Sequence, residues 1–282
     1  MTSRPYAEVI GDPIGHSKSP LIHNFWLGKL GIDAEYRAMR VTSDELGTYF
    51  EARARDDDWR GCNITMPHKI AALAHVHKHR DPSFPVEPIN TVVKGSGRLE
   101  GINTDTNGVM EPLMRLLGEI DLSGRIPEPG SRPATVIGAG GVLYPVMSAL
   151  SAFGFAPITI ALRDTSKFAA LEHDYRGVHV RPLELGRELP KAALLLNASP
   201  LGMTAFPAFP YGVESVREGG IVFDMVYSPI ETDLLRAARA RGLATVDGLQ
   251  MLVAQAAAAF QCFFRQPPPR QHDAELRAML LA

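Results

Sequence analysis

The sequence predicts an α/β protein of two domains, the first of which contains a mostly parallel β-sheet. Short apolar segments typical of strands alternate with segments of helical periodicity, which is the pattern of such a sheet. A Pro- and Gly-rich connector at residues 124–133 interrupts the alternation, which then restarts with an apolar strand and a Gly-rich turn at residues 135–141. With 282 residues, the chain is long enough for two domains.

Elements of the first half follow from apolar spacing and helix start signals. Ser19 is the expected N-cap of a helix at residues 20–30, with Pro20 at its first position. Ser43 is expected to cap a second helix at residues 44–54. A third helix is expected at residues 67–77, and strands are expected at residues 6–10, 34–41, 62–64 and 91–93.

The second half repeats the alternation after the connector. Helices are expected at residues 143–153 and 232–241, the latter ending before Gly242. Strands are expected at residues 135–137, 158–162, 192–196 and 221–225.

Composition excludes several classes of protein. Lys and Arg total 29 against 31 Asp and Glu, which argues against a nucleic-acid or anionic-membrane surface. The only cysteines, Cys62 and Cys262, lack metal-ligand spacing and are too few for a disulfide scaffold. The first residues lack the apolar core of a signal peptide, and the longest apolar run, residues 251–260, is too short to span a bilayer. We therefore expect a cytoplasmic protein.

Histidines offer one alternative. His75 and His79 are spaced to face one side of a helix, as metal ligands do, but a basic helix end is the favoured interpretation and no metal is expected.

Lys69 and Asp105 are the most informative pair of residues. Both lie in polar, Asn/Thr-rich segments punctuated by Gly, which predicts loops at the ends of strands. A lone Lys here is usually solvated, and an Asp in such a turn is usually a cap. A proton-handling Lys/Asp pair ahead of a dinucleotide cradle is nevertheless the arrangement of an oxidoreductase whose substrate domain comes first.

The Gly-rich turn is the candidate dinucleotide cradle. Its residues are Gly138, Ala139, Gly140 and Gly141, which follow a strand and precede a helix. Glycines there permit a tight turn and a close approach of pyrophosphate to backbone N–H groups. Because the bulky Leu143 and Tyr144 follow, a purely structural strand–turn–helix stays open as an alternative.

Three charged residues follow the next strand, where the adenine ribose of a dinucleotide lies. Arg163 and Lys167 favour a 2′-phosphate, and Asp164 favours a 2′-hydroxyl. The balance predicts NADP, with NAD as the alternative cofactor. A solvated charged loop is the competing interpretation.

Seven segments, in order and at suitable spacing, resemble motifs of the shikimate dehydrogenase family, which includes quinate/shikimate dehydrogenases. Residues 61–69 match its Gly-x-Asn-Val/Ile-Thr-x-Pro-x-Lys motif, and residues 197–203 match Asn-Ala-Ser/Thr-Pro-x-Gly-Met. The remaining segments are residues 11–20, 89–91, 103–105, 224–232 and 248–257. The chain departs from the family where Glu87-Pro88 replaces Gly-Ala, after the Gly-rich turn, and at Leu162-Arg163-Asp164.

The resemblance implies a domain organisation and a set of site residues. A substrate-binding catalytic domain would comprise residues 1–107, joined by C-terminal helices at residues 248–282. A Rossmann-type dinucleotide-binding domain would comprise residues 108–247. Ser17, Ser19 and Tyr227 would hold a ring carboxylate, and Thr65, Asn90, Asp105 and Gln255 would pair with ring hydroxyls. Met203, Gly248 and Met251 would lie on the cofactor side.

The activity implied is interconversion of 3-dehydroshikimate and shikimate with a nicotinamide cofactor. When hydride reaches a ring carbonyl, charge develops on oxygen, and the Lys69 ammonium, paired with Asp105, would stabilise it and supply the proton. The alternatives are a quinate/shikimate dehydrogenase that uses NAD, and a paralogue that binds a ring carboxylate without efficient turnover. A small-molecule ligand and a monomer or homodimer are expected.

Overall fold

Two compact units make up the chain. The computed structural model describes residues 4–78, 87–121, 132–138, 140–167, 174–175 and 178–282. Unit 1 combines Met1–Asp105 with Gln255–Ala282, and unit 2 is Thr106–Ala254. The expected domain boundaries, after residues 107 and 247, lie near the observed boundaries after residues 105 and 254. The roles given to the two domains stay predictions.

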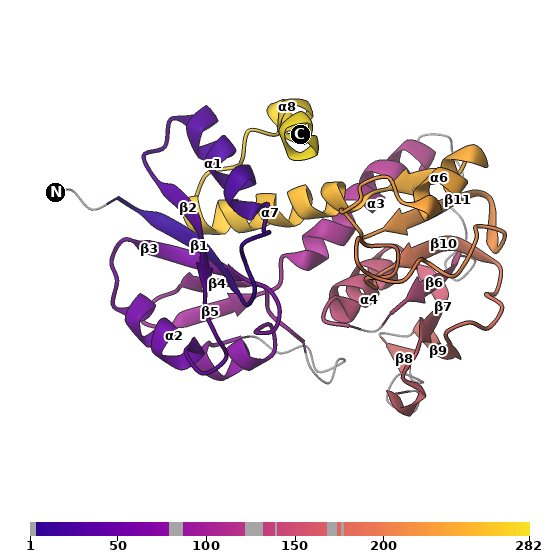
Figure 1. Ribbon diagram of the computed structural model, residues 1–282, viewed down its shortest axis with the longest axis horizontal. Coiled ribbons are helices and arrows are strands. Elements are labelled where there is room, and N and C mark those ends of the chain that lie inside the picture. Colours follow the sequence, from indigo (N-terminus) through magenta and orange to yellow (C-terminus); the bar gives the residue numbers. More distant parts are fainter. Residues whose placement is uncertain (1–3, 79–86, 122–131, 139, 168–173, 176–177) are drawn as a thin grey trace. The chain divides into compact units, whose positions relative to one another are not determined.

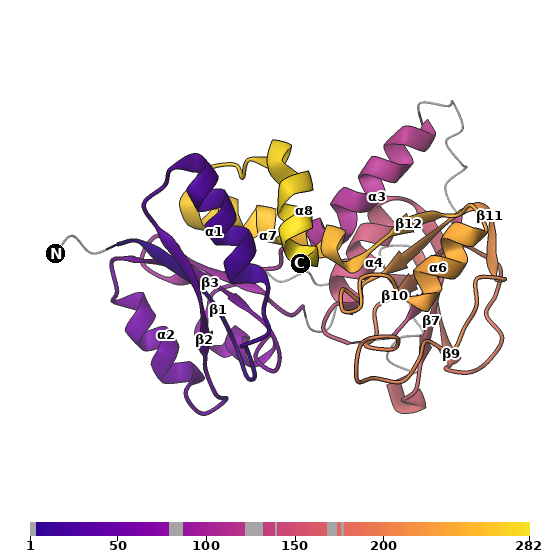
Figure 2. The same cartoon turned by 45° about the horizontal axis from the view of Figure 1, so that its top comes forward.

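Unit 1 is built on a five-stranded sheet of order β2-β1-β3-β4-β5. The first three strands pair in parallel, whereas β4 and β5 add antiparallel to the β3 edge. Helices α1, α7 and α8 lie on one side of this sheet and α2 lies on the other (Figures 1 and 2). The strands are β1 (Tyr6–Gly11), β2 (Glu35–Arg40), β3 (Trp59–Ile64), β4 (Thr91–Lys94) and β5 (Leu99–Ile102). The helices are α1 (Ser19–Leu30), α2 (Leu46–Ala54), α7 (Gly248–Phe264), which begins in unit 2, and α8 (Asp273–Leu281), with 3-10 helices at Ala71–His75 and Arg270–His272.

Unit 2 contains a seven-stranded sheet of order β12-β11-β10-β6-β7-β9-β8. Counting from β6, this is the 3-2-1-4-5-6 order of a doubly wound fold, with β8 added antiparallel at one edge. The strands are β6 (Arg132–Ile137), β7 (Phe155–Leu162), β8 (Asp174–Tyr175), β9 (Val178–Glu184), β10 (Ala192–Asn197), β11 (Val216–Asp224) and β12 (Ala244–Val246). The helices are α3 (Asp105–Asp121), α4 (Leu143–Ala152) and α6 (Asp233–Ala240), with a 3-10 helix at Thr165–Lys167.

An aromatic cluster fills the core of unit 1 between the sheet and α7. His23 stacks on Tyr36 with ring centroids 3.9 Å apart, and Trp26 and Phe260 pack edge to face. Trp26, Tyr36 and Phe260 are fully buried, so each contributes roughly 1.5–3 kcal/mol of apolar transfer free energy. This cluster therefore joins the start of the chain to its last long helix.

The two expected serine caps are wrong. Lys18 takes a helical conformation, so α1 begins at Ser19, and the Ser17 hydroxyl accepts from the Ser19 N–H at 3.3 Å. Helix α2 begins at Leu46 after a turn in which Glu45 accepts from the Thr42 N–H at 2.9 Å. Neither helix start therefore has a side-chain hydrogen bond from the serine that was expected to cap it.

The expected helix at residues 67–77 is reduced to a 3-10 helix at Ala71–His75. His77 instead pairs with β5, because its N–H donates to Leu99 O and its carbonyl accepts from Gly101 N–H, both at 2.8 Å. Asp105, expected in a loop, is the first residue of α3. Of the predicted connector, residues 124–131 lie outside the described residues.

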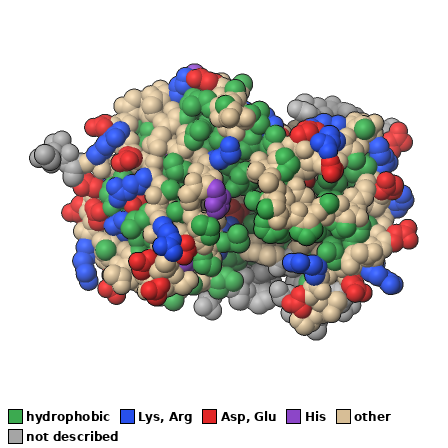
Figure 3. Space-filling model, viewed as in Figure 1, with side chains coloured by type: hydrophobic (Ala, Val, Ile, Leu, Met, Phe, Trp, Pro, Cys, Tyr) green, Lys and Arg blue, Asp and Glu red, His purple; other side chains and the backbone are tan. Residues whose placement is uncertain are grey.

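Charge is mixed on the surface. On the face drawn in Figure 3, basic and acidic side chains of the described residues are interspersed, in keeping with a formal net charge of −2. Among the described residues, the helices are all too short or too polar to cross a membrane. Within the same residues, His, Cys, Asp and Glu side chains form no group of three suited to a metal ion, and His79 lies outside them.

Candidate active site

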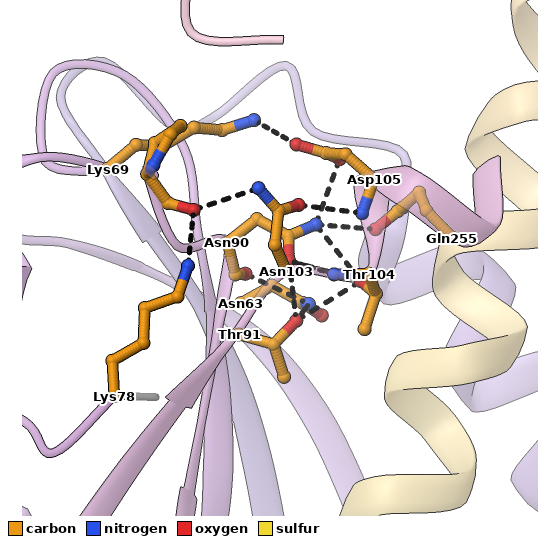
Figure 4. A network of polar contacts seen from close by, with 10 residues as sticks. Asn63, Lys69, Lys78, Asn90, Thr91, Asn103, Thr104, Asp105 and Gln255 are labelled. Carbon is orange, nitrogen blue, oxygen red and sulfur yellow. Dashed lines mark hydrogen bonds and ion pairs between the residues drawn. The ribbon is translucent and has the colours of Figure 1, made fainter. Parts of the chain in front are cut away.

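Lys69 and Asp105 form a close ion pair in unit 1 (Figure 4). Lys69 Nζ donates to Asp105 Oδ2 at 2.6 Å, and the two side chains are only 19% and 8% exposed. Lys69 lies in the turn between β3 and the 3-10 helix at Ala71–His75, whereas Asp105 begins α3. Sequence-distant segments thus bring an ammonium and a carboxylate together in a partly desolvated place, where charge interactions are stronger than in water.

Asp105 is fixed by three features. Its Oδ1 accepts from Asn90 Nδ2 at 2.9 Å, and its N–H donates to Asn103 Oδ1 at 3.0 Å. It also stands at the N-terminus of a 17-residue helix, where the helix dipole favours a negative charge. The carboxylate is therefore oriented before any ligand arrives.

Asn90 links these groups to the core. Its Oδ1 accepts from the Thr104 N–H at 2.7 Å and the Thr91 hydroxyl at 3.0 Å. The Thr91 hydroxyl accepts from Asn63 Nδ2 at 2.9 Å, and Asn63 Oδ1 accepts from the Tyr36 hydroxyl at 2.6 Å. Buried, satisfied networks of this kind hold side chains in one arrangement.

The predicted substrate residues divide between the units. Ser17, Ser19, Thr65, Asn90 and Gln255 lie in unit 1, and Gln255 Oε1 accepts from Asn90 Nδ2 at 3.5 Å, the limit of a hydrogen bond. Ser17 follows β1 and Thr65 follows β3. Because these two strands are parallel neighbours, both residues come after the carboxyl ends of strands on the same side of the sheet. Tyr227 belongs to unit 2, where burial raises the pKa of its hydroxyl.

A pocket of about 370 Å³ lies in unit 2 where its strand order reverses. It is lined by residues at the carboxyl ends of β6, β7 and β10, which is where open α/β sheets bind their ligands. Four predicted cofactor residues line it: Gly138, Gly140, Arg163 and Asp164.

Gly138 explains why the turn needs glycine. Its φ is +103°, and a Cβ there would lie 3.1 Å from Ser199 Cβ and 3.2 Å from Ala198 O. The Gly138 N–H donates to Ala161 O at 2.8 Å, which ties the turn to the end of β7. Leu143 and Tyr144 are buried and absent from the pocket lining, so their bulk does not narrow it.

The charged cofactor residues of the pocket and the predicted cofactor residues outside it have different surroundings. Asp164 Oδ1 accepts from the Ser166 N–H at 3.2 Å and from its hydroxyl, while Arg163 is exposed. Gly248 is packed so closely that a Cβ would lie 2.5 Å from the carbonyl oxygens of Met225 and Val226. The described pocket lining does not include Gly141, Lys167, Met203, Gly248 or Met251, and Ala139 lies outside the described residues.

Sequence reasoning missed several residues that support the site. Asn63 and Asn103 lie inside recognised motifs, and the position of Asn103 two residues before Asp105 is an Asx-turn signal. Tyr36 carries no such signal, because only the folded sheet brings its hydroxyl to Asn63.

Unit 2 has the fold of a Rossmann-type dinucleotide-binding domain, and unit 1 carries a prepared ammonium–carboxylate pair. A family model described as the shikimate dehydrogenase substrate binding domain matches residues 9–92. The shikimate dehydrogenase (NADP(+)) of Sphingopyxis alaskensis is 44% identical over 279 residues, which are 99% of this chain and 97% of that protein. The chain belongs to the shikimate dehydrogenase family.

Solved structures agree over nearly the whole length. Shikimate 5-dehydrogenase from Thermus thermophilus, in complex with NADP(H) and shikimate, has a TM-score of 0.79 at 33% identity and covers 98% of this chain and 100% of its own. Quinate dehydrogenase from Corynebacterium glutamicum, in complex with NAD, has a TM-score of 0.81 at 28% identity, with 98% and 99% coverage. The predicted fold class and family are therefore confirmed.

Proposed function

We propose that the chain is an NADP-dependent shikimate dehydrogenase, which interconverts 3-dehydroshikimate and shikimate. The observation that carries this proposal is the partly buried contact of 2.6 Å between Lys69 Nζ and Asp105 Oδ2. It is supported by relatives named for this activity and by the shikimate and NADP(H) bound to the Thermus thermophilus protein.

Lys69 is the proposed proton donor and acceptor. As the ring carbonyl is reduced, negative charge develops on its oxygen, and an ammonium beside it stabilises the charge and transfers the proton. Asp105, oriented by Asn90 and the N-terminus of α3, holds the ammonium in place and accepts from a ring hydroxyl. In the reverse direction, the neutral amine of Lys69 removes the proton from the alcohol.

Substrate recognition is assigned to hydroxyl and amide groups. Ser17, Ser19 and Tyr227 bind the ring carboxylate, and Thr65, Asn90 and Gln255 bind ring hydroxyls. Such groups reject an analogue that leaves them without partners, since an unsatisfied buried donor costs about 1–3 kcal/mol.

NADP is the proposed cofactor, and it supplies or accepts the hydride. The pocket residues fit a dinucleotide: Gly138 and Gly140 expose backbone at the start of α4, and a side chain at Gly138 would crowd Ser199. The Asp164 carboxylate already accepts from Ser166, while the exposed Arg163 offers a planar fork to a 2′-phosphate. We further propose a cytoplasmic monomer or homodimer.

Quinate with NAD is the second candidate, because the Corynebacterium glutamicum neighbour is a quinate dehydrogenase with bound NAD. Initial rates with shikimate and quinate, each with NADP⁺ and NAD⁺, separate the two. The expected result is the highest kcat/KM for shikimate with NADP⁺. A higher value for quinate with NAD⁺ would overturn it, and ligand binding without turnover in any combination would favour the non-catalytic paralogue.

A further inference from the structure

We infer that Lys78 and Glu87 are positioning residues for the Lys69–Asp105 pair. They clamp the segment 87–89, which connects the backbone at Lys69 to the turn before Asp105. This inference rests on the proposed function, because it assigns a support to the groups that would transfer the proton.

The segment 87–89 touches both halves of the pair. Ile89 N–H donates to Lys69 O at 3.1 Å, which holds the backbone that carries the ammonium. Pro88 O accepts from Asn103 Nδ2 at 2.8 Å, and Asn103 Oδ1 in turn accepts from Asp105 N–H at 3.0 Å. Loosening of this segment would therefore release both the backbone at Lys69 and the turn that precedes Asp105.

Lys78 holds the segment at three acceptors, and Figure 4 draws its contact with one backbone carbonyl. Its Nζ lies 2.6 Å from Glu87 Oε1, 3.2 Å from Glu87 O and 3.4 Å from Pro88 O. An ammonium has three N–H donors, so these acceptors suit its chemistry. The two side chains are 8% and 13% exposed, and a partly buried pair resists the screening that weakens surface pairs.

The base of the clamp is itself anchored. His77, the neighbour of Lys78, exchanges two backbone hydrogen bonds with β5 through Leu99 and Gly101. Lys78 therefore extends from the edge of the sheet, and β5 leads directly to the turn at Asn103. The sheet provides a common reference for the clamp and for Asp105.

The expected consequence is a selective loss of turnover. Lys78→Met keeps the apolar stem but removes all three donors, so the segment 87–89 loosens. Displacing a catalytic group by about 1 Å costs on the order of 10²-fold in rate, so we expect a 10- to 100-fold fall in kcat. KM for shikimate should rise by a smaller factor than kcat falls, because loosening the segment 87–89 affects Asn90 and Asp105 but not Ser17, Ser19 and Thr65, which are held by other segments.

Three further variants sharpen the test. Lys78→Arg keeps charge and donors and should restore most of kcat. Glu87→Gln leaves the two backbone carbonyl acceptors and should cause a smaller loss than Lys78→Met. Lys29→Met removes the ammonium of the surface pair Lys29–Glu275, whose side chains are 32% and 50% exposed, and should leave kcat unchanged.

The experiment combines initial rates with amide hydrogen exchange of Ile89 followed by NMR. A fall in kcat that exceeds the rise in KM, together with faster Ile89 exchange in Lys78→Met and recovery in Lys78→Arg, supports the inference. Unchanged kcat, or kcat and KM altered in parallel with a lower Tm, overturns it. Where Lys78→Met does not fold, the same readouts on Glu87→Gln decide.

Failure of the proposed function is distinguishable from failure of this inference. If the unmodified chain does not oxidise shikimate, the proposed function fails, and exchange at Ile89 alone then tests the clamp. If the unmodified chain is active and Ile89 exchange is the same in Lys78→Met, only the clamp is wrong.

Discussion

At the scale of single residues, the site depends on the contact between Lys69 Nζ and Asp105 Oδ2. Replacing Lys69 with Ala removes the proton donor and acceptor but leaves Ser17, Ser19 and Asn90 in place. We expect kcat to fall by about 10²–10⁴, the usual loss for a general acid, while ligand affinity measured by calorimetry changes little. A Lys69→Ala variant with near-normal kcat would remove the residue from the mechanism, and Lys29→Ala is the matched control.

Cofactor choice is also a single-residue question. Arg163 lines the unit 2 pocket, and Asp164 is engaged by Ser166. Arg163→Ala should raise KM for NADP⁺ by about 10- to 100-fold, the equivalent of a lost charge-assisted hydrogen bond, and change KM for NAD⁺ much less.

Two further variants check this assignment. Asp164→Ser should improve use of NADP⁺ by removing a repulsive charge. The exposed Arg187, which is outside the pocket lining, provides the control Arg187→Ala. The opposite outcome is that Asp164→Ser impairs the use of NAD⁺ while Arg163→Ala has little effect. It would mean that the Asp164 carboxylate binds the adenine ribose and that the enzyme prefers NAD.

Individual residues were predictable where a motif carried them. Lys69, Asp105 and Asn90 lie in motifs of the family, and the structure brings all three into contact with one another through Asp105. Tyr36 was not predictable, because its hydroxyl reaches Asn63 only after β2 and β3 have both paired with β1 and the aromatic cluster has packed. The role proposed for Lys78 likewise was not predictable. It depends on a contact with Glu87, and their spacing in the sequence matches neither helical nor strand periodicity.

At the scale of elements, helix α6 depends on one hydroxyl. Thr232 Oγ1 accepts from Leu235 N–H at 3.2 Å as N-cap and donates to the buried Asp224 Oδ2 at 2.6 Å. Burial raises the pKa of Asp224. The same burial keeps water away from the carboxylate, so water cannot readily replace the Thr232 hydroxyl as a donor.

Thr232→Ala should therefore lower the free energy of unfolding by about 2 kcal/mol, the upper end for a cap. Thr232→Ser retains the hydroxyl and should lose less than half as much. Urea denaturation of the three proteins measures both values, and equal stability of Thr232→Ala and the unmodified chain would contradict the assignment.

Prediction of elements succeeded for most apolar runs, missed helix α3, and failed where tertiary pairing competed. The sequence of residues 67–77 has helical character, but His77 is taken into the sheet by Leu99 and Gly101, which ends the helical turn early. Strand β5 was not expected, although the Gly-Ser-Gly between two apolar runs is a hairpin signal. Strands β6, β7, β10 and β11 of unit 2 were expected correctly because buried parallel strands are continuous apolar runs, whereas β8, β9 and β12 were not expected.

At the scale of the whole molecule, the buried His23 makes stability depend on pH. Burial lowers the pKa of His23 to about 3 from an ordinary value of 6.5. In the folded protein the ring stays neutral while the unfolded chain takes up a proton below pH 6.5. The unfolded state then binds more protons, so stability falls as pH decreases from about 6.5 toward 3.

The contribution of His23 reaches about 1.4 kcal/mol for each pH unit in this window. His23→Phe, which keeps an aromatic ring against Tyr36, should show a smaller loss of unfolding free energy between pH 7.5 and 5.5. Replacing the exposed His179 with Phe is the control. If His23→Phe and the unmodified chain lose the same free energy over this range, another group controls acid unfolding.

The fold class was predictable from alternation alone, and the doubly wound order of unit 2 confirms the Rossmann-type expectation. The discontinuous composition of unit 1 was expected only from the family resemblance. Local sequence signals do not report it, because the aromatic contacts that hold α7 in unit 1 join residues more than two hundred positions apart.

That discontinuity sets an order of events during synthesis. Phe260 and Phe263 lie within 6.0 Å of the His23 ring, yet they leave the ribosome after all of unit 2. The continuous unit 2 is therefore able to fold while the nascent unit 1 still exposes Trp26 and Tyr36. Until α7 emerges, that apolar surface is the natural target for a chaperone, and a stalled or truncated chain would present it permanently.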